Sequence, residues 1–238
     1  MIRAVLFDLD DTLFDHRLCA QLALTDLHRA HDAFQSCPFD DFERIHAGFL
    51  EELHRQVMSG EMPLDLARQE RFRRMFEAVG VTPDEETVIH AAATYRDGYR
   101  RVRQPIAGAA RLLGRVKERA LVGIVSNNLL EEQQYKLRTC QLDPYVDALV
   151  VSEEAGVSKP DPYIFELALG RLACDPGEAV MVGDSWPADI VGARAAGIRA
   201  IWFNPDARPA PEPDAGIEEL RALDPPDAAL ALIFGADR

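Results

Sequence analysis

Short runs of consecutive apolar residues recur along the chain and predict buried β-strands. The five runs are residues 4–7, 121–125, 148–151, 179–182 and 200–203. Runs of this length without polar alternation are typical of strands that are covered on both faces. Segments with helical spacing lie at residues 130–139, 162–172, 188–196 and 228–234. This alternation predicts an α/β fold with a parallel, Rossmann-like sheet and helices on both faces.

The segment between residues 16 and 101 follows another pattern. Its apolar residues recur at three- and four-residue spacing, as do Phe42, Ile45, Phe49, Leu53 and Val57. Such spacing predicts amphipathic helices, and the segment has room for about four of them, as in a small helical bundle. Thr82, followed by Pro83, is the expected N-cap of one of these helices.

The order of these patterns predicts two domains. The α/β core consists of residues 1–15 and 102–238, because the first strand belongs with the later strands. An all-α domain of residues 16–101 is inserted after the first strand. Sheets of this type bind ligands at the carboxyl ends of their strands. The insert is therefore expected to lie over the site and to decide which substrate is accepted.

Composition narrows the range of partners. Of the 238 residues, 47% are hydrophobic and 28% are charged, which is ordinary for a folded protein. The formal charge of −14 repels nucleic-acid phosphates and anionic lipid, so we expect no nucleic-acid and no membrane partner. A small phosphorylated substrate stays possible, because a metal ion inverts the local charge.

The chain has the features expected of a cytoplasmic protein. No apolar segment approaches the ~20 residues that a membrane span needs, and the apolar N-terminal stretch is too short for a signal-peptide core. The cysteines, which are far apart in the sequence and form no metal motif, are Cys19, Cys37, Cys140 and Cys174. Reduced thiols are their expected state. A monomer or a homodimer is expected.

Acidic residues follow the first and the fourth apolar runs. Asp8 and Asp10 are two apart after the first run, so their side chains point the same way in an extended chain. Like charges this close are costly unless a cation or a shared proton relieves them. Asp184 and Asp189 follow the fourth run. If the fourth strand lies beside the first, Asp8, Asp10 and Asp184 share one sheet edge, and three carboxylates suit Mg²⁺. The alternatives are a turn after the first run and, for Asp189, an acidic first turn of a helix.

Ser126 and Lys159 are candidates for binding an anion. Ser126 and Asn127 follow the second run, where a hydroxyl and backbone amides can bind phosphate oxygens or cap the next helix. Lys159 lies in a loop that Pro160 and Pro162 stiffen, and a lysine so placed supplies a fixed positive charge for phosphate. The alternative is an ordinary surface lysine.

Taken together and in this order, the motifs resemble those of the haloacid dehalogenase-like superfamily. They are Asp-x-Asp-x-Thr, a Ser-Asn pair after a strand, a Lys-Pro-Asp-Pro loop, and Gly-Asp with a later Asp. The resemblance covers the α/β part from Val5 to about Phe203, and the inserted segment resembles the helical cap of that family. It implies a Mg²⁺-dependent enzyme that forms an aspartyl-phosphate.

The resemblance implies a role for each residue of the acidic motifs. Asp8 is the implied nucleophile. Asp10 is the implied acid that protonates the leaving oxygen and then the base that activates water. Asp8, Asp184 and the backbone carbonyl of Asp10 are the implied Mg²⁺ ligands, and Thr12 positions this loop.

The other motif residues are implied to bind and neutralise the phosphoryl group. Ser126 hydrogen-bonds it, with help from the backbone amide of Asn127. Lys159 neutralises the charge of the nucleophile and the phosphoryl group, and Asp189 orients Lys159 or a metal-bound water. These roles fit the chemistry, because phosphoryl transfer depends on positioning and on charge neutralisation.

The motifs also indicate a branch of the family. The acid at Asp10 favours phosphate esters, because the dehalogenases of the superfamily lack it and need no Mg²⁺. The phosphonate-cleaving branch uses a cap lysine, and residues 16–101 contain none. The motifs look most like those of small phosphatases that act on nucleoside monophosphates or sugar phosphates. The expected partner is a small phosphorylated metabolite.

Other functions stay open at this point. A sugar-phosphate mutase keeps the acid at Asp10, and a dehalogenase shares the fold. A receiver-like domain also binds Mg²⁺ and accepts a phosphoryl group on an aspartate, although it needs no large insert. A binding protein that has lost activity is a further alternative, although no expected catalytic position is missing here.

Overall fold

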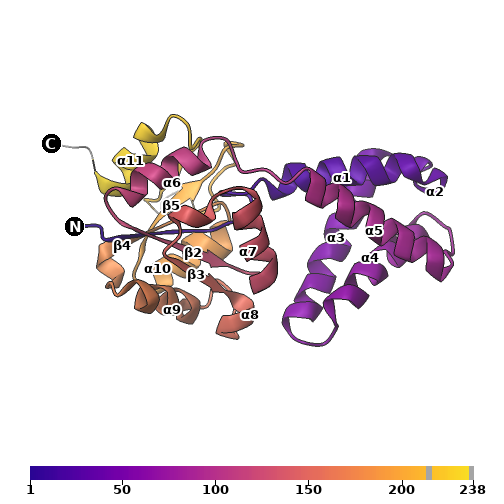
Figure 1. The fold of residues 1–238 in the computed structure, drawn as a ribbon, viewed down its shortest axis with the longest axis horizontal. Helices are drawn as coiled ribbons and strands as arrows, with labels where there is room; N and C mark the ends of the chain where they lie inside the picture. The colour runs from indigo at the N-terminus through magenta and orange to yellow at the C-terminus, as the bar shows by residue number, and fades with distance from the viewer. Residues whose placement is uncertain (213–215, 236–238) are drawn as a thin grey trace. The chain divides into compact units, whose positions relative to one another are not determined.

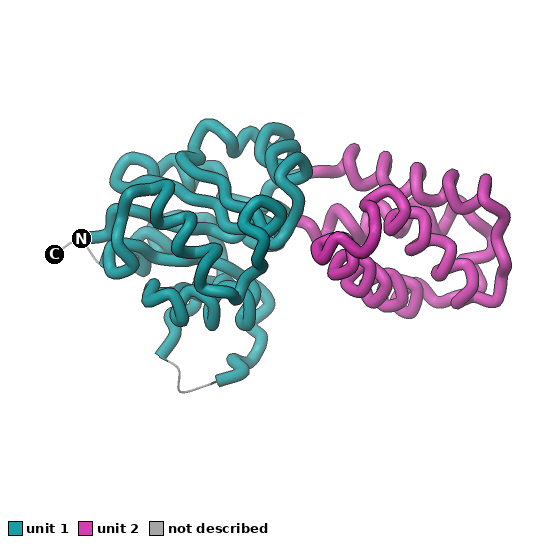
Figure 2. Tube along the Cα trace, turned by 90° about the horizontal axis from the view of Figure 1, so that it is seen from below, with its two compact units in different colours: residues 1–15, 104–238 teal, residues 16–103 magenta. Residues whose placement is uncertain are grey.

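The computed structural model describes residues 1–212 and 216–235, and it divides into two compact units. Unit 1 comprises Met1–Asp15 and Gln104–Arg238, and unit 2 comprises His16–Arg103 (Figure 2). The chain leaves unit 1 once, after the first strand, and returns to it before the second strand.

A six-stranded sheet forms the centre of unit 1. Its strands are β1 (Ala4–Phe7), β2 (Leu121–Ser126), β3 (Ala148–Val151), β4 (Ala179–Gly183), β5 (Arg199–Phe203) and β6 (Glu218–Leu220). They lie in the order β3-β2-β1-β4-β5-β6, and each neighbouring pair is parallel. The carboxyl ends of β2, β1 and β4 are therefore neighbours at one sheet edge. The predicted α/β fold with a parallel sheet is confirmed.

Helices cover the sheet of unit 1 on two sides. They are α6 (Ala109–Lys117), α7 (Leu130–Thr139), α8 (Ser152–Ala155), α9 (Pro162–Leu172), α10 (Gly192–Ala195) and α11 (Pro226–Phe234), with a π-helical segment at Trp186–Val191. Figure 1 shows α6 and α11 on one side of the sheet and α9 and α10 on the other. Leu6 and Met181 of the sheet share a buried core with Phe165 of α9.

Unit 2 consists of helices around their own core. They are α1 (His16–Ala30), α2 (Asp32–Gln35), α3 (Phe39–Met58), α4 (Leu64–Ala78) and α5 (Glu85–Arg101). Four of these helices are long, and α2 is a single turn. Phe34, Phe42 and Phe76 pack together in the buried core, with ring centroids of neighbouring pairs 4.3 to 4.7 Å apart. The periodic apolar residues thus form the inner faces of a helical unit.

Several elements differ from the predicted pattern. Asp84, not Thr82, is the N-cap of α5, because its carboxylate accepts a hydrogen bond of 2.8 Å from the backbone N of Thr87. Both residue types cap helices well, so the local sequence does not choose between them. β6, α6 and the single-turn helix α8 have no counterpart in the prediction. β6 has only one apolar residue, so no apolar run marks it.

Neither a long apolar helix nor a disulfide is found in the part of the chain that the structure describes. No described helix is both long and apolar enough to cross a membrane. All four cysteines are free thiols, and Cys19 and Cys140 are buried.

Candidate active site

The loop after β1 places Asp8 at the sheet edge. The backbone N of Asp8 donates to the carbonyl of Val182 in β4 at 3.0 Å, so Asp8 continues the sheet by one residue. The chain then turns sharply, since Asp11 has a positive φ of 63° and the backbone N of Phe14 donates to the carbonyl of Leu9 at 2.8 Å. Aspartate tolerates this left-handed conformation better than most residues. The turn leaves Asp8 largely buried at the carboxyl end of β1.

The ammonium group of Lys159 lies at the centre of the site. Its Nζ donates to the carboxylates of Asp8 and Asp189, each at 2.6 Å, and to the carbonyl of Val125 at 2.7 Å. These bonds use all three ammonium protons, and the side chain is only 3% exposed. Burial by itself would lower the pKa of Lys159, but the carboxylates of Asp189 and Asp8 raise it above its usual value. Lys159 is therefore a fixed positive charge beside Asp8.

The side chain of Asn127 holds the Lys159 loop in place. Its Nδ2 donates to the carbonyl of Lys159 at 2.9 Å, and its Oδ1 accepts from the backbone N of Lys159 at 2.7 Å. The sequence points to the backbone amide of Asn127 as the functional group, and the structure adds this use of its side chain. The loop before α9 is thereby fixed to the end of β2.

Asp184 lies at the carboxyl end of β4, beside Thr12. The backbone N of Asp184 donates to the Thr12 hydroxyl at 3.1 Å, and Thr12 is fully buried. Burial, with the carboxylates of Asp189 and Asp11, raises the pKa of Asp184 to about 7, and Arg208 opposes the rise. So high a pKa indicates that the positive charges near Asp184 do not offset its burial and the negative charges of its neighbours.

Three carboxylates converge at this edge of the sheet. Asp8, Asp184 and Asp189 each offer one oxygen, and these oxygens lie within 4.8 Å of one another. Burial raises the pKa of Asp8 well above its usual value, although Lys159 opposes this effect. Converging carboxylate oxygens suit a hard divalent cation. Among the described residues, Asp189 joins the expected ligands Asp8 and Asp184 in this group, and the side chain of Asp10 does not.

The Asp10 side chain turns toward α7. Its carboxylate accepts from Lys136 Nζ at 2.5 and 2.8 Å, from Gln133 Nε2 at 2.9 Å and from Asn128 Nδ2 at 3.2 Å. Gln133 Nε2 also donates to Ser126 Oγ at 2.5 Å. One amide group therefore connects the expected acid with the serine that is expected to bind the phosphoryl group.

Gln133 and Lys136 are site residues that the sequence analysis does not find. Both are buried, and Leu137 is buried beside them on α7. Residues three and four apart share one face of a helix, so Gln133 and Lys136 lie on the same face of α7 as the buried Leu137. A buried polar residue needs a partner, which is the signal that identifies them. The sequence does not show that the partner is Asp10.

The charged side chains of the site carry an excess of negative charge. Five carboxylates face two lysines and one arginine, and the set consists of Asp8, Asp10, Asp11, Asp184, Asp189, Lys136, Lys159 and Arg208. Two negative charges are left over when all eight groups are ionised. A divalent cation among the carboxylates would neutralise this excess and would lower the raised pKa of Asp184.

Gly183, the last residue of β4, leaves no room for a side chain. A Cβ there would lie 2.4 Å from both Cγ and Oδ2 of Asp189, whose oxygens are fixed by Lys159 at 2.6 Å and by the backbone N of Ser185 at 3.0 Å. We expect Gly183→Ala to lower the free energy of unfolding by about 1–3 kcal/mol, as overpacking does, because Asp189 and its partner Lys159 would have to move. Thermal melting measures this effect.

Gly170 offers a matched control for this change. It lies within α9, and no atom is within 4 Å of the Cβ position. Gly170→Ala is expected to be neutral or to stabilise by up to about 1 kcal/mol. Equal effects of the two changes would contradict the close packing of Gly183 against Asp189.

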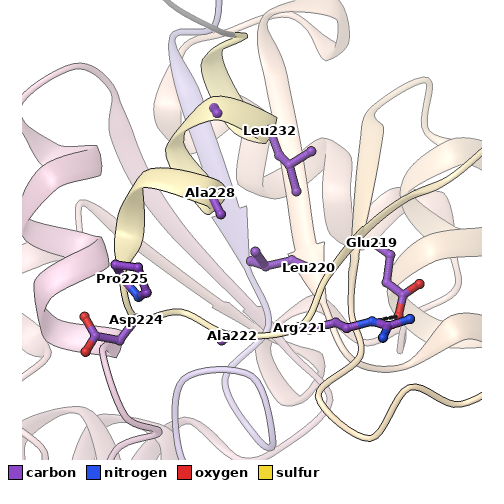
Figure 3. A pocket seen from close by; sticks show the side chains of 9 residues that line it. Glu219, Leu220, Arg221, Ala222, Asp224, Pro225, Ala228 and Leu232 are labelled. Atoms are coloured by element: carbon purple, nitrogen blue, oxygen red, sulfur yellow. Dashed lines mark hydrogen bonds and ion pairs between the residues drawn. The ribbon is translucent and has the colours of Figure 1, made fainter.

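A separate hollow is lined by none of these site residues. It lies along β6 and α11, and its apolar lining includes Leu220, Ala222, Pro225, Ala228 and Leu232 (Figure 3). Its charged side chains are paired, Glu219 with Arg221 at 2.9 Å and Asp224 with Arg111 at 2.7 Å. The hollow therefore lacks the converging charges that are found at the end of β1.

Comparisons with known proteins point to one family. The profile of the haloacid dehalogenase-like hydrolases matches residues 2–197. Phosphoserine phosphatase from Thermus thermophilus is 31% identical over 93% of this chain and 98% of its own length. Pyrimidine 5'-nucleotidase YjjG from Escherichia coli is 31% identical over 87% of this chain and 88% of its own length. The crystal structure of the HAD-hydrolase YfnB from Bacillus subtilis, bound to magnesium, has a TM-score of 0.74 and 28% identity, with 97% of each chain covered.

Proposed function

Because the chain belongs to the haloacid dehalogenase-like hydrolase family, we propose that it is a phosphatase that hydrolyses small phosphate monoesters at Asp8. The observation that supports this best is the carboxylate of Asp10, which three side chains hold in place. Cleavage of a phosphate ester expels an alkoxide, which needs a proton donor. Cleavage of a carbon–halogen bond expels a halide, which needs none. A carboxyl group that is held in place to donate a proton therefore favours a phosphate ester as the substrate.

The proposed reaction has two steps. A carboxylate oxygen of Asp8 attacks phosphorus, the ester P–O bond breaks, and Asp10 gives its proton to the leaving oxygen, which departs as an alcohol. Water then attacks the aspartyl-phosphate, Asp10 accepts a proton from that water, and the bond between Asp8 and phosphorus breaks to release phosphate. Dividing hydrolysis into two displacements lowers each barrier.

The remaining residues supply charge and position. Lys159 provides positive charge beside the attacking carboxylate, where the transferring phosphoryl group gathers negative charge. Asn127 and Asp189 keep Lys159 there through the hydrogen bonds described above. Ser126 Oγ accepts from Gln133, so its own proton is available for a phosphoryl oxygen.

Mg²⁺ is the cofactor that fits this site. We propose that Asp8, Asp184 and the backbone carbonyl of Asp10 hold it, with Asp189 near enough to orient a ligand water. The converging oxygens and the excess negative charge support this choice. When bound, Mg²⁺ polarises the phosphoryl oxygens and reduces the repulsion between an anionic substrate and Asp8.

A screen for phosphate release in the presence of Mg²⁺ tests the proposed function. The panel contains nucleoside monophosphates, sugar phosphates, phosphoserine and p-nitrophenyl phosphate, and repeated turnover of at least one ester is expected. Chloride release from a 2-chloro acid without phosphate release would identify a dehalogenase instead. Isomerisation of a sugar phosphate would identify a mutase, and a single stoichiometric phosphorylation would identify a receiver. We propose that unit 2 decides which ester is accepted.

Without metal, the raised pKa of Asp184 predicts a stability that falls as the pH rises. The unfolded carboxyl ionises near 3.8, whereas the folded one keeps its proton up to about 7. The folded state therefore loses stability between about pH 4 and 7, by an amount on the order of 2–4 kcal/mol. Mg²⁺ supplies the missing counter-charge. The rise in Tm that excess Mg²⁺ causes should therefore grow over the same pH range, as thermal melts would show.

Asp184→Asn is the matched variant for this prediction. Its side chain cannot ionise, so the metal-free variant should melt above the wild-type protein at about pH 8 and should gain little from Mg²⁺. A Tm gain from Mg²⁺ in the wild-type protein that is the same at low and at neutral pH would contradict the prediction.

A further inference from the structure

Donor groups from α7 and the loop before it surround the Asp10 carboxylate. Lys136 Nζ reaches both oxygens, at 2.5 and 2.8 Å, while Gln133 Nε2 and Asn128 Nδ2 reach Oδ2 at 2.9 and 3.2 Å. Lys136 and Gln133 are 4% and 0% exposed, so few other rotamers are open to them. These contacts hold the Asp10 carboxylate in one place and one orientation.

The orientation of the Gln133 amide follows from its neighbours. The amide nitrogen, not the oxygen, faces Asp10, because Gln133 Nε2 donates to Asp10 Oδ2 at 2.9 Å. The same nitrogen faces Ser126 Oγ at 2.5 Å, which makes the serine the acceptor in that bond. Gln133 therefore fixes the distance between Asp10 and Ser126, and α7 acts as a common support for both.

Burial of Lys136 at this position is unfavourable for the stability of the fold. It lies on the inward face of α7 beside Leu137, where an apolar side chain would pack without loss of hydration. Burying an ammonium group is costly, and an ion pair only offsets that cost when its geometry is good. Stability alone does not explain why a lysine is buried at this position. This indicates that Lys136 acts through its partner Asp10.

We propose that Lys136 is a positioning residue that holds Asp10 at the place where it exchanges protons with the leaving oxygen and with water. This inference rests on the proposed phosphatase function. Lys136 acts through Asp10 and not on the phosphoryl group, which is the task of Lys159. When the lysine is removed, Asp10 keeps its two amide donors but loses the contact that fixes both of its oxygens.

This role predicts a dependence on the leaving group. A misplaced acid slows expulsion of a poor leaving group most, because a good one departs with little help from a proton. Phenyl phosphate and p-nitrophenyl phosphate have nearly the same shape, but the nitro group makes the second phenolate a much better leaving group. A defect in proton transfer therefore changes the ratio of their kcat/KM values, whereas a general loss of structure or of phosphoryl binding lowers both alike.

The experiment compares Lys136→Met and Lys136→Arg with the wild-type protein in excess Mg²⁺. We expect Lys136→Met to lower kcat/KM for phenyl phosphate by about 10²-fold, the loss typical of a catalytic group misplaced by about 1 Å. The loss for p-nitrophenyl phosphate should be several-fold smaller. Lys136→Arg keeps donors for both carboxylate oxygens and should restore the ratio toward its wild-type value.

The Asp10→Asn background supplies the decisive control. If Lys136 acts through Asp10, adding Lys136→Met to Asp10→Asn should cause little further loss with p-nitrophenyl phosphate, because the group that it positions is already disabled. Losses that multiply in the double variant would overturn the inference, and so would an unchanged ratio of the two esters in Lys136→Met. If the wild-type protein releases no phosphate from any ester, the proposed function fails, which is a different result.

Discussion

Asp8→Asn is expected to lower kcat for p-nitrophenyl phosphate by at least about 10⁴-fold, since loss of a catalytic nucleophile typically costs on the order of 10⁶-fold. Asparagine has nearly the same shape as aspartate, but its amide is a very weak nucleophile and forms no aspartyl-phosphate. Its side-chain oxygen still accepts from Lys159, which bonds Asp8 Oδ1 at 2.6 Å. The fold should therefore survive, and thermal melting together with steady-state phosphate release checks both points.

Asp11→Asn is the matched control for this change. It is the same substitution three residues later, and asparagine tolerates the positive φ of 63° at this position. Asp11 is not among the carboxylates that converge with Asp184 and Asp189, so this variant should keep most of its activity. Wild-type turnover by Asp8→Asn would show that another group attacks phosphorus.

Lys159→Met carries the second large expected effect. Methionine has a similar length but no charge, so the buried carboxylates of Asp8 and Asp189 lose their common partner. We expect kcat to fall by about 10²–10³-fold, as it does when a charge-stabilising donor is removed. The free energy of unfolding should fall by about 3–5 kcal/mol, because breaking a buried ion pair leaves charges uncompensated.

Lys117→Met separates this effect from the general loss of a lysine. Lys117 pairs with Asp147 at the surface, where its side chain is 35% exposed, and exposed pairs contribute about 0–1 kcal/mol. Denaturant unfolding of the two variants gives the comparison. Similar losses of stability in both would mean that the Lys159 cluster contributes no more than a surface pair.

The sequence predicts those strands whose burial shows as apolar runs. β1 to β5 begin and end within one residue of the predicted runs, because most of their residues are buried, including those of the edge strand β3. β6 has the sequence Glu218-Glu219-Leu220 and lies at the opposite edge, where only Leu220 is buried. Its pairing with β5 therefore leaves no pattern in the sequence.

The local sequence likewise predicts some residues of the site and not others. Asp8, Lys159 and Asp184 follow strands or lie in a proline-stiffened loop, so the chemistry of each residue is visible from its local context. Lys136 and Gln133 lie within the helical sequence Glu-Glu-Gln-Gln-Tyr-Lys-Leu, which looks like a solvated helix. Only the packing of α7 against the end of β1 shows that two of its polar residues meet an acid more than a hundred positions earlier in the chain.

The central place of β1 in the sheet also sets an order of events during synthesis of the chain. β1 precedes unit 2 in the sequence, yet both of its partners, β2 and β4, lie beyond unit 2. The buried residues of the unit 2 core cluster run from Ala23 to Tyr95, so its contacts are more local and form early. Asp8 therefore comes together with Lys159 and Asp184 only after most of unit 1 has been made. Until then its carboxylate lacks the partners that bind and bury it in the folded protein.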